Sequence, residues 1–324
     1  MCSCVNNLEQ ERVSVQLEFI SFLATDKVKM PGLLYRPEQK TKRAAIWLHG
    51  MGDNGLFYNP ERINALGDAL TEREIAFLAF NNRGAHNSKS LRIIDDSLPE
   101  EGQRYRGGTH YELIADCVKD IDGAAAYLME HGFSELYLVG HSTGANKICA
   151  YHIRAKKNQI SKYVLAGAGD DCGLFFNELG DGRFKQALQY AKQKVAEHKP
   201  MVRMPKYTGM YPFSAQSAFD ILNPDGAYNT FPFYEATTKR LGRKPLFEEF
   251  STIDIPTLVI FGDSDEYAYT AGGTVKALEL FREHTNPKYT ASFSYQLVAN
   301  ADHGFHGQFE QFAEQVAEWL SFTP

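Results

Sequence analysis

The stretch "LVGHSTGANK", residues 138–147, decides the fold expected for this chain. It joins a short apolar run, 135–140, to a segment with helical spacing that begins at Thr143. Residues 140–144 fit the pattern G-x-S-x-G, which is informative only between a strand and a helix. A sharp turn there would strain the backbone of Ser142, and side chains in place of the two glycines would collide with the neighbouring strand and helix. The turn would present the serine hydroxyl beside a helix N-terminus.

Short apolar runs alternate with helical segments along most of the rest of the chain. This alternation predicts a mostly parallel sheet with helices on both faces, that is, an α/β fold. Alternating polar and apolar residues in 12–37, with a turn at Thr25–Asp26, predict an antiparallel strand pair at the start. Ligands of such sheets bind at the carboxyl ends of the strands. The predicted buried strands are 44–50, 75–80, 135–140, 162–169, 255–262 and 292–298.

An acid and a base follow the serine in sequence, each just after a predicted strand. Asp263 and Asp265 come directly after 255–262, and His303 and His306 follow 292–298. A serine hydroxyl needs an imidazole to accept its proton, and the imidazole needs a carboxylate to fix its tautomer. The order serine, acid, histidine is the order that an α/β-hydrolase requires.

Over roughly 40–170 and 253–324 these motifs resemble the α/β-hydrolase superfamily. In that family the acid is commonly the third residue after the glycine that closes its strand, which implies Asp265, with Asp263 as the nearest rival. The family histidine precedes a glycine and an aromatic or aliphatic residue, which implies His303, with His306 as the rival. Catalytic Ser142, Asp265 and His303 are therefore expected.

The loop His49-Gly50-Met51-Gly52 resembles the HG-x-G loop of the same family. The resemblance implies that the backbone N–H groups of Met51 and Thr143 form the oxyanion hole. Arg83 is expected to be structural. Thr109 and Glu112 fit a capping box at the start of a helix over 109–132. Arg104, Tyr105 and Arg106 are candidates to face the pocket.

The alternation lapses between 171 and 252. We therefore expect a core domain, 1–170 and 253–324, with a mainly helical cap or lid inserted at 171–252. Residues 180–245 carry eleven Lys/Arg against five Asp/Glu, together with clustered aromatic residues. A basic and aromatic cap would suit an anionic or polar-aromatic small-molecule substrate.

The net charge of −6 gives no indication of nucleic-acid binding. No stretch approaches the ~20 apolar residues of a membrane span. The cysteines are scattered, as is typical of free thiols in a reducing cytoplasm, and the pair Cys2 and Cys4 has no partner with which to complete a metal site. We expect a cytoplasmic protein without a metal or cofactor. The oligomeric state is left open.

The sequence favours a carboxylic-ester hydrolase that forms an acyl-enzyme on Ser142. A thioesterase or an amidase/peptidase would use the same residues, and a non-catalytic small-molecule-binding member of the fold is a further alternative. Haloperoxidase-type chemistry is less favoured. The elbow and its helix, "GHSTGANKICAYH", also resemble the siderophore-esterase-like group of α/β-hydrolases. That resemblance implies a polar ester or a hydroxamate-type substrate.

Overall fold

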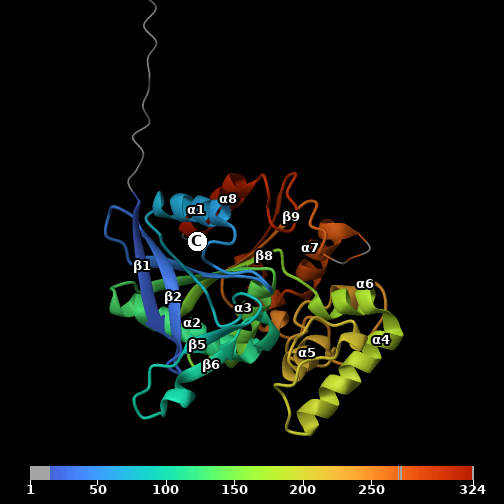
Figure 1. The fold of residues 1–324 in the computed structure, drawn as a ribbon. Helices are drawn as coiled ribbons and strands as arrows, with labels where there is room; N and C mark the ends of the chain where they lie inside the picture. Colours follow the sequence, from blue (N-terminus) through green and yellow to red (C-terminus); the bar gives the residue numbers. More distant parts are fainter. Residues whose placement is uncertain (1–14, 269, 271, 323–324) are drawn as a thin grey trace, which may run out of the picture.

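The computed structural model describes residues 15–268, 270 and 272–322. Its centre is an eight-stranded sheet in the order β1-β2-β4-β3-β7-β8-β9-β10 (Figure 1). The first two pairings in this order are antiparallel and all the others are parallel, which confirms both the mostly parallel sheet and the initial antiparallel pair. The strands are β1 Gln16–Leu23, β2 Lys29–Arg36, β3 Arg43–Leu48, β4 Ala76–Phe80, β7 Glu135–His141, β8 Ile160–Ala166, β9 Thr257–Gly262 and β10 Phe293–Val298.

Helices cover both faces of the sheet because its central strands bury side chains on both sides. In β3, Ala45 and Trp47 pack against α1 (Pro60–Thr71) and α8 (Phe309–Ser321). The alternate residues Ala44, Ile46 and Leu48 belong to the core on the opposite face. That face is covered by α2 (Cys117–Glu130), α3 (Thr143–Arg154) and α7 (Gly273–His284). A short 3₁₀ segment, Pro287–Ser292, precedes β10.

Residues 171–252, called the insertion below, lie in the connection between β8 and β9, which are neighbours in the sheet. Figure 1 shows its helices α4, α5 and α6 gathered to one side of the sheet. None of the helices in the described residues combines the length and apolar character needed to cross a membrane. The elements of the insertion are α4 Asp171–Ala196, α5 Ala215–Leu222, α6 Phe233–Thr237, and 3₁₀ turns at Lys206–Thr208 and Phe250–Thr252.

The polar segment that follows β4 differs from the prediction. It forms a hairpin of β5 (Lys89–Arg92) and β6 (Arg104–Gly107), with 3₁₀ turns at Glu100–Gln103, Thr109–Tyr111 and Ile114–Asp116. The helix expected from 109 therefore begins at Cys117, and the predicted capping box is wrong. Thr109 and Glu112 instead use their side chains in long-range contacts, described below.

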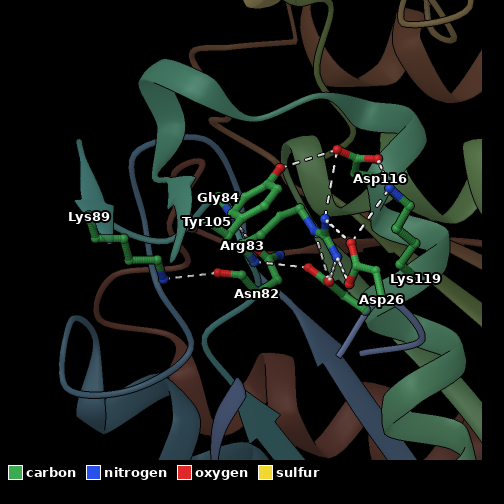
Figure 2. A network of polar contacts seen from close by, with 9 residues as sticks. Asp26, Asn82, Arg83, Gly84, Lys89, Tyr105, Asp116 and Lys119 are labelled. Atoms are coloured by element: carbon green, nitrogen blue, oxygen red, sulfur yellow. Dashed lines mark hydrogen bonds and ion pairs between the residues drawn. The ribbon is translucent and has the colours of Figure 1, made fainter. Parts of the chain in front are cut away.

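Arg83 lies after β4 at the centre of a buried polar network (Figure 2). Its guanidinium contacts Asp120 at 2.6 Å and Asp26 at 3.0 and 3.1 Å, and it stacks 4.9 Å from the centre of the Tyr105 ring. Burial alone would lower the pKa of Arg83, but the carboxylates of Asp120 and Asp26 raise it overall. The network ties the turn after β4 to α2 and to the β1–β2 turn, so the expected structural role of Arg83 is supported.

Arg83→Met should therefore lower the free energy of unfolding by about 3–5 kcal/mol, because it leaves the buried carboxylate of Asp120 without its counter-ion. Urea unfolding at neutral pH measures this loss. The matched control is Arg36→Met, which breaks the partly exposed pair Arg36–Glu18 and should cost about 1 kcal/mol or less. Equal losses in the two variants would contradict the central role of Arg83.

Candidate active site

The turn from β7 to α3 holds Ser142 in a strained backbone conformation, with φ 56° and ψ −127°. A Cβ atom on Gly140 would lie 2.4 Å from the Gly144 carbonyl oxygen, and one on Gly144 would lie 2.0 Å from the Leu48 carbonyl oxygen. Both distances are far below any real contact, so only glycine fits at either position. These are the collisions that the sequence predicts. Because both positions are glycine, the helix, the strand and Ser142 can lie this close together.

Ser142 faces a cavity of about 520 Å³ at the carboxyl ends of the strands. This volume lies within the range of small-molecule sites. The predicted residues Met51 and His303 also line it, and the insertion contributes part of its wall. The wall residues from the insertion are Asp171, Leu174, Phe175, Glu178, Tyr211 and Phe213.

His303 and Asp265 form a close pair beside this cavity. The His303 Nδ1 atom lies 2.9 and 3.0 Å from the two carboxylate oxygens of Asp265, whose side chain is fully buried. The Tyr267 N–H donates to the same carboxylate at 2.9 Å. Gly167, at the end of β8, leaves room for the pair, because a Cβ there would lie 3.3 Å from both side chains. An imidazole oriented in this way can accept a proton at Nε2.

Within the described residues, no hydrogen bond joins the Ser142 hydroxyl to His303, although both side chains line the same cavity. Hydrogen bonds between catalytic groups are often long or poorly aligned until a substrate is bound. A joint role of Ser142 and His303 is therefore compatible with the absence of this hydrogen bond.

Neither rival residue belongs to this pair, although His306 also lines the cavity. Asp263 is exposed and accepts hydrogen bonds from the Asn300 N–H and the Ser264 hydroxyl. His306 is exposed and pairs with Asp302 at 2.9 Å. Neither rival is joined to His303 by a recorded contact in the described residues.

The buried ion pair of Arg62 and Asp53 is linked to the backbone of His303 through His141. The His141 Nε2–H donates to the His303 carbonyl at 2.7 Å, and Arg62 donates to Nδ1 of His141 at 3.5 Å. Arg62 itself pairs with Asp53 at 2.8 Å and reaches the Gly304 carbonyl at 3.4 Å. Burial and the charge of Arg62 lower the pKa of His141 well below its usual range, so its ring is neutral. We infer that this network holds the His303 loop in place.

The loop after β3 lies directly against Ser142. A Cβ atom on Gly50 would lie 2.8 Å from the Ser142 Cβ and 3.2 Å from its hydroxyl oxygen. Thr143 is the first residue of α3, so its N–H has no acceptor within the helix. The two predicted donor residues, Met51 and Thr143, thus flank the serine.

Two side chains hold this loop, and the sequence patterns missed the role of both. The Thr109 hydroxyl accepts from the Gly52 N–H and donates to the Gly84 carbonyl, both at 2.9 Å. Lys147, on the buried side of α3, donates to the His49 carbonyl at 3.2 Å and pairs with Glu112 at 2.7 Å. A lysine at a buried position of the elbow helix was the available signal.

His49 is fully buried and lies outside the cavity lining, and burial lowers its pKa well below the usual range. Its Nδ1 contacts the Gly50 carbonyl at 2.9 Å. These contacts support a structural role. The three residues 104–106 do not line the cavity; Tyr105 packs under Arg83, and Arg106 lies over Tyr111.

The basic residues of the insertion do not line the cavity either, among the residues that the structure describes. Several pair with carboxylates of the insertion itself, as Lys185 and Lys239 do with Asp181. The charge argument for an anionic substrate therefore loses its basis.

Several known proteins are similar to this chain in sequence or in structure. A non-heme haloperoxidase of Rhodococcus erythropolis is 22% identical over 187 residues, which cover 55% of this chain and 68% of the relative. An α/β hydrolase of Penicillium sp. sh18 is 13% identical and superposes with a TM-score of 0.60, over 94% of this chain and 98% of the other. A soluble variant of monoglyceride lipase from Saccharomyces cerevisiae, solved with a substrate analog, is 16% identical with a TM-score of 0.59, over 97% and 99% of the two chains.

These likenesses show the α/β-hydrolase fold, as the sequence motifs implied. A family model described as a protein of unknown function, DUF1749, matches residues 109–321. This match covers more than half of the sequence, and the chain belongs to the DUF1749 family.

Proposed function

We propose that this chain is a serine hydrolase that cleaves a carboxylic ester through an acyl-enzyme on Ser142. The observation that carries the proposal is the His303–Asp265 pair, with Nδ1 at 2.9 Å from the carboxylate, on the cavity that Ser142 faces. An imidazole with a buried carboxylate at Nδ1 is the proton acceptor that a serine nucleophile requires.

In the proposed reaction, the Ser142 hydroxyl attacks the acyl carbon and His303 Nε2 accepts its proton. Asp265 holds the Nδ1–H tautomer and stabilises the imidazolium that forms. His303 then gives the proton to the leaving alcohol. A water molecule then attacks the acyl carbon while His303 accepts its proton, and the bond to Ser142 Oγ breaks. His303 returns the proton to Ser142, and the carboxylic acid leaves.

The N–H groups of Met51 and Thr143 would stabilise the oxyanion formed in each step. Such donors lower the barrier because they are already oriented when the charge develops, and the loss of one side-chain donor in another hydrolase costs about 2.7–4 kcal/mol. The strained turn at Ser142 and the close approach of Gly50 support this assignment.

We further propose that residues 171–252 act as a cap on a core domain of 1–170 and 253–324. Six side chains of the insertion line the cavity, whereas the sheet supplies the reacting groups. The cap would then select the substrate, and the core would carry the chemistry. The expected cytoplasmic location rests on the scattered cysteines; Cys117, Cys149 and Cys172 are free, and Cys2 and Cys4 lie outside the described residues.

Thioester or amide cleavage would use the same groups, and so would a member of the fold that binds a small molecule without turnover. The relative named a haloperoxidase keeps that chemistry as a second candidate. Haloperoxidase activity would be identified by halogenation of an organic acceptor that depends on both added peroxide and added halide. An ester hydrolase works without either.

A fluorophosphonate probe should label the wild-type protein covalently, and Ser142→Ala should abolish both labelling and hydrolysis of p-nitrophenyl esters. The reason is that Ser142 is the elbow residue whose side chain faces the cavity, whereas the neighbouring Thr143 hydroxyl donates to Asp171. Ser264→Ala is the matched control, since Ser264 is exposed at the same edge of the sheet and contacts Asp263. Full labelling of Ser142→Ala would exclude the proposed nucleophile.

Asp265→Asn should lower kcat by on the order of 10³–10⁴, because the amide favours the wrong imidazole tautomer. Asp263→Asn serves as the control and should retain kcat within a few-fold, since that side chain accepts from the Ser264 hydroxyl and the Asn300 N–H, which an asparagine oxygen can also do, and does not contact His303 among the described residues. Steady-state kinetics at pH 7–8 compare the two. A larger loss in Asp263→Asn would reverse the assignment of the acid.

Thr109→Val should lower kcat about tenfold with little change in KM, because the Gly52 N–H and the Gly84 carbonyl lose the hydroxyl that joins them. Thr71→Val, in the buried helix α1, loses a comparable bond to the Gly67 carbonyl and controls for stability. If both variants lose stability equally and kcat stays at the wild-type value, Thr109 has no part in positioning the loop.

A further inference from the structure

One wall of the cavity combines carboxylates with aromatic rings. Helix α4 presents Asp171, Phe175 and Glu178 to the cavity, spaced by four and three residues and therefore on one helical face. The Phe175 ring packs against Tyr211 at 6.2 Å and Phe213 at 6.0 Å between centroids. Tyr211 and Phe213 are themselves 6.0 Å apart, so the three rings form one cluster.

The carboxylates of this wall differ in how far the protein satisfies them. Asp170 accepts the N–H groups of Gly173 and Tyr234, both at 2.7 Å, and Asp171 accepts from the Thr143 hydroxyl at 3.3 Å. Burial raises the pKa of both groups, that of Asp170 to about 7. Glu178 has no hydrogen-bond or ion-pair partner among the described residues. It is therefore the carboxylate that a ligand can use.

No comparable positive charge faces the cavity. Among the described residues that line it, Arg62 is the single lysine or arginine, and its side chain is 1% exposed and paired with Asp53. Arg203 lies nearby in the insertion, but its guanidinium is bonded to the Tyr111 hydroxyl at 2.9 Å and lies over that ring. A cationic ligand would thus meet the carboxylate of Glu178 with no unpaired lysine or arginine beside it among the described residues of the lining.

The wall is also close to the proposed nucleophile. A Cβ atom on Gly169 would lie 4.0 Å from the Ser142 hydroxyl and 3.9 Å from an Asp171 carboxylate oxygen. Ser142 and the start of the α4 wall thus lie within reach of one small substrate.

We propose that the cavity selects esters that carry a positive charge, a protonated amine or a quaternary ammonium, which Glu178 and the Phe175–Tyr211–Phe213 rings bind while the carbonyl lies at Ser142. Aromatic faces attract cations through their quadrupole, and the carboxylate adds a direct charge interaction. The inference rests on the proposed ester hydrolysis for its substrate, and on the cavity wall alone for the preference for a cation.

The test compares esters of equal shape and different charge. Acetylcholine and 3,3-dimethylbutyl acetate differ only in nitrogen against carbon on the alcohol side. The p-nitrophenyl esters of 4-(trimethylammonio)butyrate and 5,5-dimethylhexanoate do the same on the acyl side. In at least one pair, kcat/KM should be about tenfold higher for the cation at low ionic strength, and salt should reduce the advantage.

Glu178→Gln should lower the cation-to-neutral ratio about fivefold, and Tyr211→Leu, at an exposed ring, should also lower it. Glu130→Gln is the matched control, since Glu130 is exposed at the end of α2, and it should leave the ratio unchanged. An unchanged ratio in Glu178→Gln would overturn the proposed cation site. So would a preference for the neutral ester in both pairs, while normal fluorophosphonate labelling would leave ester hydrolysis standing.

A binding measurement separates the two proposals. Calorimetry on Ser142→Ala should show that benzyltrimethylammonium binds more tightly than benzoate, and that Glu178→Gln removes the difference. If the cation binds in this way but no ester is cleaved and no probe labels the wild type, the esterase proposal fails and the cation site stands. If benzoate binds as tightly as the cation, the cation site is excluded whatever the kinetics show.

Discussion

The close packing of three backbones around Ser142 is the constraint on which the site depends. Strand β7, helix α3 and the end of β3 approach so closely that neither Gly140 nor Gly144 has room for a side chain. Strain at one serine, of order 1–3 kcal/mol, persists because the surrounding sheet and helix are fixed by their own burial. The same approach brings the loop after β3 against the serine. One steric arrangement thus places both the hydroxyl and the backbone donors proposed to act with it.

Buried cations contact three of the loops around the site. Arg62 holds the carbonyl of Gly304 next to the histidine, Lys147 holds that of His49, and Arg83 ties down the turn after β4. Buried ion pairs of this kind contribute little net stability, because desolvation offsets much of their attraction. Their effect here is geometric, since each charge fixes a loop that has no regular secondary structure of its own. The hydrogen bonds of Thr109 do the same with a neutral group.

The sequence predicted the sheet well because its strands are short apolar runs bounded by polar turns, as in 255–262. It also placed Ser142, Asp265 and His303 at the same edge, where the structure brings the acid and the histidine into contact. It failed in the polar segment before α2. There Thr109 and Glu112 match a local capping pattern, but in the structure both side chains bind partners far away in the sequence.

The excess of basic residues in the insertion suggested an anionic substrate, and this inference also failed because it ignored where the side chains lie. Counting lysines and arginines says nothing about which way they face, and those of 180–245 do not face the cavity among the described residues. The carboxylates that do face it, such as Asp171 and Glu178, precede the counted range. Orientation, which depends on how α4 packs, could not be obtained from composition.

Gly180 breaks α4 with a φ of 71°, so this long element is two helices joined at one residue. The α4 side chains that line the cavity all precede the break, and Phe184, Ala187 and Ala191 after it are buried in the core. The two halves therefore have different structural roles. A substitution at a lining position before Gly180 changes the surface of the cavity, whereas one in the second half affects mainly the packing of its apolar face.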